Sequence, residues 1–454
     1  MSVISDYIGV SAVQNVKNAI EAAKRSEGFN ALLSLSEERA LERAAKVDAG
    51  EISGRLAGVP FVAKDNFLTL GGTTTAASDF LRGFASPLQA TAVERLEAEG
   101  AICIGKSNLD AFAHGGSTEN SAFGPTKNAV DDTKVAGGSS GGSAVVTALG
   151  IVPFAIGTDT GGSIRQPASF NGVVGVKPTY GTVSRYGVVA MASSTDTIGC
   201  FATNAADAEL VMDIMAGKDA NDMTTLPDFF APEQPATLKI GVIKEAMTDD
   251  VDAEVRASVQ AYVDGLKAAG HTVEDVSLPM LKYALAIYYI VVPAEISSNL
   301  ARYDGIRYGN RADATDLTGV YGKSRDAGFM AENKRRIMIG SYVLSSGFFD
   351  AYYLQAQKAR TLLIGEFDKL FERYDTLVTP VAPTPAFAIG ENATDPVKMY
   401  LADVMTVPAS LAGLPAISVP ANPTAAGLPV GVQLIGPRRS DARLLALAKS
   451  QEVA

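Results

Sequence analysis

The sequence predicts an α/β protein whose chain forms one large domain, layered α/β/α around a mixed β-sheet. Short apolar runs alternate with amphipathic helical segments in the first half of the chain, and this rhythm resumes after residue 238. The 454 residues are 47% hydrophobic and 20% charged, which is ordinary for a globular protein with a sizeable core. We expect residues 1–454 to fold together, with N-terminal helices over 1–57, a core over 58–216 and the rest of the sheet and further helices over 217–454.

The individual elements follow from apolar periodicity and from helix and turn signals. In chain order we expect helices over 11–26 and 36–50, a strand over 58–65, a helix over 91–100, a strand over 101–105, a helix over 143–149, strands over 151–156, 172–177 and 186–190, a helix over 205–216, a strand over 239–242, a helix over 251–270, and strands over 271–278, 376–379, 416–420 and 430–435. Residues 282–371 are expected to be mostly helical, with a polar interruption over 303–328. A boundary rich in Asp, Pro and Thr is expected over 218–238.

Charge and cysteine usage exclude several classes of function. The net charge of -11 argues against a chain that grips a nucleic-acid backbone by itself, because such binding needs a concentrated basic surface. The two cysteines form neither a disulfide framework nor a metal-ligand spacing, which predicts no metal site and favours a reducing cytoplasm. The N-terminus does not resemble a signal peptide, and Pro153 and Pro293 interrupt the longest apolar stretches, so we expect no membrane span.

The most informative stretch is residues 134–178, which holds two serine clusters set among glycines. The first reads GGSSGGS from Gly137 and the second GTDTGGSIR from Gly157. Between them lies an apolar segment long enough for one short helix and one buried strand, so both clusters can lie at one point in space. Glycines let backbone N–H groups approach a ligand closely, which suits a nucleophile beside an oxyanion hole.

Three candidates could activate such a serine. His114 and His271 are the only histidines, and neither stands in a convincing triad order with GSSGG at 138–142, a weak match to the G-x-S-x-G elbow around Ser140. Lys64 ends the strand expected over 58–65, where Pro60 excludes a helical interior. Burial there would lower the pKa of the ammonium group toward neutrality and make Lys64 a base, although a lysine at a strand end can also extend into solvent.

A phosphate-binding loop is the competing motif. Residues 100–107 read GAICIGKS and match the P-loop pattern. The four residues between the glycines must then form an open loop whose amides face phosphate, yet Ala-Ile-Cys-Ile is typical of a buried strand. We therefore expect the match to be accidental.

These motifs together resemble the amidase signature family. Its Ser-Ser-Lys triad has a lysine in a K-D pair, a serine in GGSS(G/A)G and a nucleophile in D-x-G-G-S-I-R, which stand here as Lys64-Asp65, residues 137–142 and residues 159–165. The resemblance implies the amidase signature fold, Ser163 as nucleophile, Ser139 as proton relay across a cis Gly138–Ser139 peptide, and Lys64 as base. It also implies an oxyanion hole and supporting residues. The oxyanion hole comprises the amides of Thr160, Gly161, Gly162 and Ser163, and the supports are Ser140, Asp159 and Arg165.

Within this family, long segments resemble the glutaminase component of the glutamyl-tRNA(Gln)/aspartyl-tRNA(Asn) amidotransferase. Among them are KDNFLTLGGTTTAAS, GGSIRQPASFNGVVGVKPTYGTVSRYG and DPVKMYLADVMTVPASLAGLPAISVP. The resemblance implies a cytoplasmic subunit that hydrolyses glutamine for a B-type partner, which would hold the tRNA, ATP and Mg²⁺, while a small C-type subunit bridges the two. No cofactor is then expected in this chain. A zwitterionic substrate needs a cationic and an anionic anchor, for which Arg336 and Asp403 match the family positions, with Tyr288 or Tyr289 as a further contact.

The chain departs from the family pattern at three places. The loop near the expected substrate amide reads His114-Gly115-Gly116-Ser117 instead of Met-Gly-Ser-Ser, and Ser410 and Cys200 replace the usual Asn and Pro. None of these positions belongs to the triad, but the first puts the substrate in question. Two alternatives therefore stay open: a free-standing amidase that acts on another carboxamide, and a catalytically silent assembly subunit.

Overall fold

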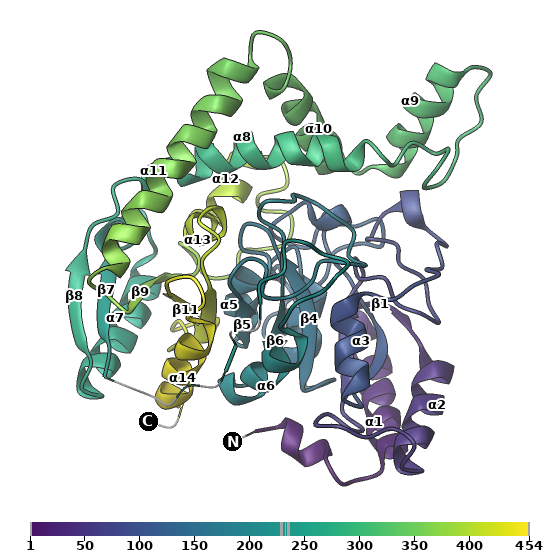
Figure 1. Ribbon diagram of the computed structural model, residues 1–454, viewed down its shortest axis with the longest axis horizontal. Helices are drawn as coiled ribbons and strands as arrows, with labels where there is room; N and C mark the ends of the chain where they lie inside the picture. Colours follow the sequence, from purple (N-terminus) through teal and green to yellow (C-terminus); the bar gives the residue numbers. More distant parts are fainter. Residues whose placement is uncertain (1, 228–229, 232, 234–236, 453–454) are drawn as a thin grey trace.

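The eleven strands of the described residues form one mixed sheet, which runs through the centre of the computed structural model (Figure 1). The structure describes residues 2–227, 230–231, 233 and 237–452. The strand order is β1-β3-β2-β4-β6-β5-β10-β11-β9-β7-β8. β2, β3 and β4 are parallel neighbours, as are β7, β8 and β9, and the strands between these two groups pair antiparallel. The last third of the chain thus joins the sheet built by the first, as expected.

The strands are β1 (Leu32–Leu35), β2 (Pro60–Lys64), β3 (Ile102–Ser107), β4 (Phe154–Asp159), β5 (Val174–Lys177), β6 (Thr197–Ala202), β7 (Lys239–Ile243), β8 (Thr272–Val276), β9 (Thr376–Pro380), β10 (Ala416–Pro420) and β11 (Gly431–Ile435). The α-helices are α1 (Ala12–Arg25), α2 (Glu37–Asp48), α3 (Thr91–Ala98), α4 (Gly141–Ala148), α5 (Arg165–Asn171), α6 (Ala205–Met215), α7 (Ala253–Ala268), α8 (Leu281–Leu300), α9 (Leu317–Gly328), α10 (Ala331–Val343), α11 (Leu354–Phe371), α12 (Pro396–Leu401), α13 (Val407–Leu411) and α14 (Asp441–Glu452).

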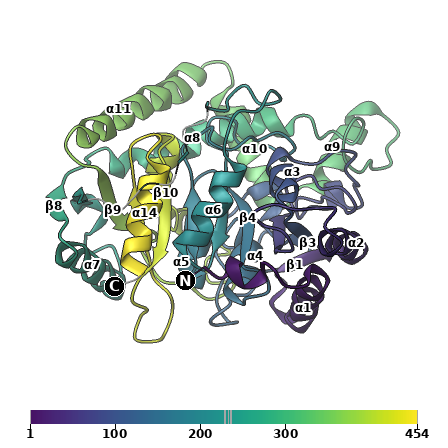
Figure 2. The same ribbon diagram turned by 60° about the horizontal axis from the view of Figure 1, so that its bottom comes forward.

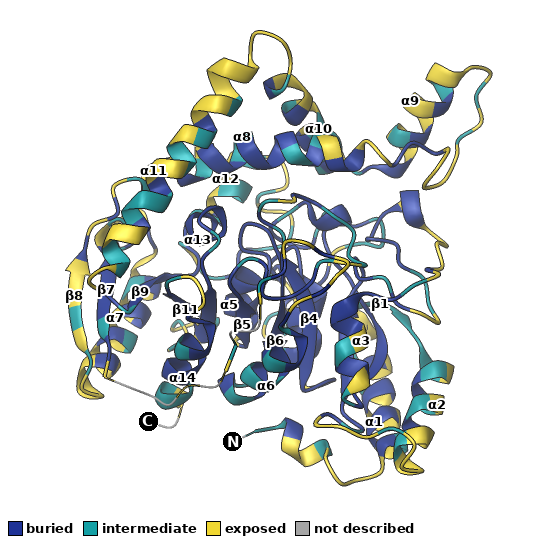
Figure 3. Ribbon diagram, viewed as in Figure 1, coloured by how far each residue is buried: buried dark blue, intermediate teal, exposed yellow. Residues whose placement is uncertain are grey.

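Helices cover both faces of the sheet because the buried strands are apolar on both sides. On β2, Val62 packs with α1, α2 and α4, whereas its neighbours Phe61 and Ala63 pack with α3, α6 and α14 on the opposite face. Figure 2 shows α6 and α14 side by side over the sheet. The inner strands of the sheet are buried, whereas the edge strand β8 and the outer sides of the helices carry yellow, exposed residues (Figure 3).

Helices α8, α10 and α11 cross one end of the sheet, and α9 projects away from it (Figure 1). α8 packs along α10 and against α11 and α13. This crossing layer lies beside the strand ends that carry the candidate site, so it can close the site and supply side chains to it. Among the described helices, none combines the length and the apolar character needed to traverse a bilayer.

Most expected elements are present with shifted ends, but two predictions were wrong. Residues 186–190 form no strand, because Gly187 takes a φ of +78° and interrupts the extended backbone. The expected interruption over 303–328 contains α9, whose first turn is capped by the Asp316 carboxylate accepting the Gly319 N–H at 2.7 Å. The boundary expected over 218–238 lies partly outside the described residues.

Several elements were not predicted, and β6 shows the reason. Gly199 lies in the middle of this strand, and glycine weakens a strand pattern in sequence. In the structure a Cβ at this position would lie 1.9 Å from the Val176 carbonyl oxygen. Glycine is therefore required by the close approach of β5. The other unpredicted elements include β1, α5, α12, α13 and α14.

Candidate active site

The ends of two neighbouring parallel strands bring the first candidate residues together. β2 ends at Lys64 and β4 ends at Asp159, and Ala63 lies opposite Ile156 in their register. α4 begins directly after Ser139 and Ser140, and packs against both strands. The two serine clusters therefore meet at the carboxyl edge of the sheet, where open α/β sheets usually carry their sites.

Lys64 is completely buried and surrounded by hydroxyl groups. Its Nζ lies 2.8 Å from Ser139 Oγ, 2.8 Å from Ser140 Oγ and 3.0 Å from Thr158 Oγ1. No ion pair of Lys64 is found in the part of the chain that the structure describes, and burial lowers the pKa of its ammonium group to about 7. Lys64 can thus be neutral at physiological pH and accept a proton from a neighbouring hydroxyl.

Ser139 and Ser140 lie equally close to Lys64 but differ in their other bonds. The Ser140 hydroxyl donates to the Thr158 carbonyl oxygen at 3.1 Å, which fixes its orientation. Ser139 follows a cis Gly138–Ser139 peptide bond, as expected from the family resemblance, and its hydroxyl makes no second hydrogen bond within the described residues. Ser139 is therefore the hydroxyl that is free to exchange protons with a further group.

Ser163 ends a backbone segment, residues 160–163, whose N–H groups have no acceptor in the described part of the chain. Among the described residues, no hydrogen bond engages the amides of 160–163 or the Ser163 hydroxyl. The Ser163 carbonyl oxygen accepts the Ser140 N–H at 3.2 Å, so the two serine clusters are in contact. Gly162 takes a φ of +151°, and a Cβ there would lie 2.2 Å from Thr406 Oγ1. Glycine is thus required at this position, and four consecutive donors stay available to an anion.

A buried ion pair supports this segment from behind. Asp159 and Arg165 are both fully buried, and the guanidinium donates to the two carboxylate oxygens at 2.8 and 2.9 Å. Burial alone would raise the pKa of Asp159, but Arg165 holds it below its usual value. Arg165 also donates to Ser410 Oγ at 2.8 Å, so the serine that departs from the family pattern completes this cluster.

Arg336 lines a cavity of about 210 Å³, and Asp110 on the same cavity donates its N–H to the Ser139 carbonyl oxygen at 3.2 Å. Only 3% of Arg336 is exposed, and its guanidinium lies over the rings of Tyr289 and Tyr400. Its Nε donates to Glu332 Oε1 at 2.7 Å. The other nitrogens of the guanidinium have no carboxylate partner among the described residues. Asp110, Gly115, Gly116, Arg335 and Tyr400 also line the cavity. The cavity therefore offers a fixed cation to an anionic ligand.

Asp403 is the acidic counterpart, and its Oδ1 is buried without a hydrogen-bond partner among the residues that the structure describes. A Cβ placed on Gly162 would lie 3.3 Å from this atom, and one on Gly116 would lie 3.6 Å from Oδ2. Burial raises the pKa of Asp403 to about 8, and the pull of Arg336 offsets only part of that effect. An ammonium group would satisfy the unpaired oxygen.

The remaining predicted substrate contacts surround the same space. Tyr288 lies against the candidate oxyanion segment, since a Cβ on Gly161 would lie 2.7 Å from its hydroxyl. Tyr289 follows it on α8 and stacks on Tyr400 with ring centroids 3.9 Å apart, beside Arg336. Gly115 has no room for a side chain, because a Cβ there would lie 2.2 Å from Asp110 Cγ. Both tyrosines thus reach the site, one near each end of it.

The competing motifs do not form sites. Lys106 of the P-loop match belongs to strand β3 and forms a buried ion pair with Asp65 at 3.0 Å. His114 is buried, and its Nδ1 lies 2.6 Å from the Phe112 carbonyl oxygen. Burial lowers the pKa of His114 to about 3, and within the described residues no hydrogen bond links it to Ser139 or Ser163. His271 Nδ1 accepts the Leu238 N–H at a strand end.

Several polar residues of the site were not predicted from the sequence. Thr158 contacts Lys64, and it could have been found because it directly follows the first glycine of GTDTGGSIR, on the strand that leads to the second serine cluster. Glu332 precedes Arg336 by four residues, a spacing that predicts a pair on one helix face. Asp110 and Thr406 had no such signal, because only the tertiary fold brings their loops to the serines.

A buried lysine bonded to one serine, in contact with a second serine cluster whose backbone donors lack an acceptor among the described residues, is typical of serine-dependent acyl-transfer enzymes. The particular family is shown by comparison: the family model described as Amidase matches residues 13–445, so the chain belongs to the amidase family.

The most informative relatives carry one name, that of the A subunit of glutamyl-tRNA(Gln) amidotransferase. The protein of this name from Koribacter versatilis (strain Ellin345) is 51% identical, over 93% of this chain and 91% of its own. Its counterpart from Latilactobacillus sakei subsp. sakei (strain 23K) is 51% identical over 94% and 89%. The crystal structure of the Thermotoga maritima protein of the same name has a TM-score of 0.82 and 39% identity, over 98% and 93%. A bacterial aryl acylamidase of the amidase signature family has a TM-score of 0.85 but only 26% identity, over 99% and 94%.

Proposed function

We propose that this chain is the glutamine amidohydrolase subunit of a tRNA-dependent amidotransferase. The observation that carries the proposal is the Asp403 Oδ1 atom, which is buried next to Gly162 without a hydrogen-bond partner among the described residues, together with the buried guanidinium of Arg336, whose charge acts on Asp403. Such a pair fits a zwitterionic amino acid better than an apolar amide. The names of relatives that are 51% identical over nearly the whole chain support the same function.

In the proposed mechanism Ser163 Oγ attacks the side-chain amide carbon of glutamine. Its proton passes to Ser139, whose own proton passes to neutral Lys64 across their 2.8 Å contact. The amides of 160–163 stabilise the negative charge on the amide oxygen. The proton then returns through Ser139 to the departing nitrogen, ammonia leaves, and water hydrolyses the γ-glutamyl ester on Ser163 by the same route.

The recognition of glutamine follows from the two charges. Arg336 holds the α-carboxylate and Asp403 holds the α-ammonium group, with Tyr288 and Tyr289 packed against the substrate. Asp159, Arg165 and Ser140 hold the catalytic segments in place and do not react.

The proposed assembly divides the work between several chains. A B-type partner uses the ammonia to amidate misacylated tRNA and holds the tRNA, ATP and Mg²⁺, and a small C-type subunit joins the two in the cytoplasm. This chain would hold no cofactor of its own. The net charge of -11 supports this division, because it disfavours binding of a phosphate backbone by this chain alone.

The function is tested by purifying the chain with its partners and measuring glutamate release from glutamine with and without them. Glutamine hydrolysis that increases in the assembled complex is the expected result. Rapid hydrolysis of simple apolar amides by the isolated chain, without glutamine turnover in any assembly, would instead show a free-standing amidase.

The pH dependence of kcat for glutamine should follow Lys64. The base form is neutral, so kcat should rise with pH through about 7, the lowered pKa of Lys64, and then level off. Initial rates at saturating glutamine, measured from mildly acidic to mildly alkaline pH, test this. A kcat that stays constant on the acidic side of the Lys64 pKa, where Lys64 would be protonated, would contradict Lys64 as the base.

Replacing Asp403 by asparagine should raise KM for glutamine by about 10- to 100-fold with a much smaller change in kcat, since a charge-assisted bond to the α-ammonium is lost. In the unmodified complex kcat/KM should also rise through about pH 8 as Asp403 ionises, because burial raises its pKa to that value. This limb should disappear in the variant. The measurement is the pH profile of kcat/KM for both proteins, and an identical profile would contradict the assignment.

A further inference from the structure

Asp196 connects the candidate oxyanion segment to the turn before β6. β4 and β6 are antiparallel, with Asp159 opposite Thr197, so the next pair along the register brings Thr160 opposite Asp196. The Thr160 hydroxyl donates to Asp196 Oδ1 at 2.7 Å. Thr160 is the first of the four residues whose amides lack an acceptor among the described residues, so this bond lies at the start of the segment.

The carboxylate itself is held rigidly. Asp196 Oδ2 accepts the N–H groups of Met191 at 2.8 Å and Ala192 at 3.0 Å, and the Asp196 N–H donates to the Ala192 carbonyl oxygen at 2.8 Å. α8 fixes the same turn, because Asn299 Nδ2 donates to the Met191 carbonyl oxygen at 3.1 Å. The turn is thus anchored on both sides before it reaches Thr160.

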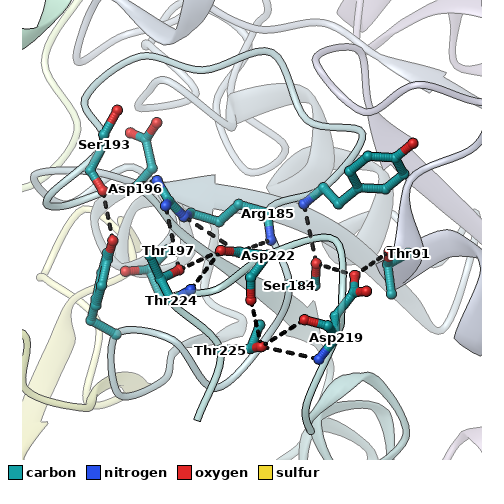
Figure 4. Close-up of polar contacts among 12 residues, drawn as sticks. Thr91, Ser184, Arg185, Ser193, Asp196, Thr197, Asp219, Asp222, Thr224 and Thr225 are labelled. Carbon is teal, nitrogen blue, oxygen red and sulfur yellow. Dashed lines mark hydrogen bonds and ion pairs between the residues drawn. The ribbon is translucent and has the colours of Figure 1, made fainter.

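Among the described residues, no cationic side chain forms an ion pair with Asp196. Asp196 lines a polar cavity of about 270 Å³ together with Arg185 and Asp222. Figure 4 shows these three side chains, with Arg185 bonded to other groups. Arg185 pairs with Asp222 and donates to the Ser193 carbonyl oxygen and Thr224 Oγ1. The two oxygens of Asp196 are left to the turn and to Thr160.

The far side of the segment has its own anchor. The Thr406 hydroxyl donates to the Gly161 carbonyl oxygen at 2.6 Å. Between the two anchors lies the peptide that joins Thr160 to Gly161, and such a peptide can rotate unless both ends are fixed. Amides that stabilise an oxyanion must already point at it before the reaction, because reorientation during the reaction would cost part of the stabilisation.

We propose that Asp196 is a positioning residue that, through the Thr160 hydroxyl, orients the backbone amides of the oxyanion hole. The inference rests on the proposed function, because it takes residues 160–163 as that hole. Asp196 contacts neither substrate nor the reacting atoms. Its removal should therefore weaken stabilisation of the transition state and leave the binding of glutamine unchanged.

The test uses the assembled complex and three variants: Thr160→Val, Asp196→Ala and the double variant. Each single variant should lower kcat for glutamine by about 10- to 100-fold, less than the loss expected from removing an oxyanion donor outright, with KM within about twofold. The double variant should lose no more than the more damaging single variant, because the two residues act as one unit. Asn221→Ala is the matched control: Asn221 lines the same cavity, its replacement leaves the Arg185–Asp222 pair in place, and kcat should be unchanged.

Rescue distinguishes positioning from general damage. Thr160→Ser keeps the hydroxyl and should retain most of kcat. This variant still tests the proposal if Asp196→Ala does not fold. Two results would overturn the proposal. One is an equal loss of kcat in Thr160→Ser and Thr160→Val. The other is a loss of kcat in the double variant that equals the product of the losses in Asp196→Ala and Thr160→Val. Absence of glutamine hydrolysis in the unmodified complex would count against the proposed function instead, so the two failures can be told apart.

Discussion

Replacing Ser163 by alanine should lower glutamine hydrolysis in the complex by at least about 10⁴-fold, as found when a nucleophilic serine is removed from other hydrolases. The proposed covalent ester cannot form without its oxygen. KM is not informative at such a rate, so binding should be measured directly by calorimetry with glutamine. We expect the affinity to be nearly unchanged, because Arg336 and Asp403 remain in place.

The same variant separates a missing nucleophile from a lost partner contact. If this chain supplies only ammonia, then added ammonium salt should restore amidation of misacylated tRNA by the Ser163→Ala complex. Failure of ammonium to restore it, in a complex that still assembles, would contradict the proposed division of work. Unchanged glutamine hydrolysis in the variant would instead support the silent assembly role.

The candidate catalytic residues stand in segments that are distinctive in the sequence, and the family resemblance then predicted their separate roles. Ser139 and Ser163 are set among glycines, and Lys64 ends an apolar run that Pro60 keeps from being helical. Each of these patterns spans only a few residues. The glycines indicate backbone freedom and the apolar run indicates burial, and both can be recognised in a single segment. The parallel register of β2 and β4 then brings the segments together without any further signal in the sequence.

The proposed substrate contacts could be predicted only through the family resemblance. Arg336 lies on α10 and Asp403 in a turn before α13, and only folding brings Asp403 to Gly162 and Arg336 to the cavity lined by Gly116. Neither residue differs locally from an ordinary surface charge. The unpaired Oδ1 of Asp403 is the distinguishing feature, and it exists only after folding.

Asp196 illustrates the same limit at the centre of the site. The Thr160 hydroxyl contacts it only because of the strand register. β6 was not predicted from the sequence, so the cross-strand pairing that brings Thr160 opposite Asp196 was not predicted either. A missed strand thus removed one supporting residue from the predicted site, while the residues proposed to react were unaffected.

Replacing Lys64 by methionine should lower kcat by about 10³-fold or more, since it removes the only proposed base and keeps a linear side chain of similar length. The residual rate should lose its dependence on pH near 7, because the group with that pKa is gone. Steady-state rates of the complex on both sides of this pKa provide the measurement. A variant that kept the limb near pH 7 would show that another group titrates there.

Lys177 offers a matched control for this experiment. It is also completely buried, and burial lowers its pKa to about 7 as well, but its Nζ donates to the Pro178 carbonyl oxygen and makes no hydrogen bond to a serine within the described residues. Lys177→Met therefore removes an equally buried amine of similar pKa from the same sheet. If burial of an amine were all that mattered, both variants would lose activity alike. We expect Lys177→Met to keep most of kcat and the pH limb near 7, because only Lys64 is in contact with Ser139.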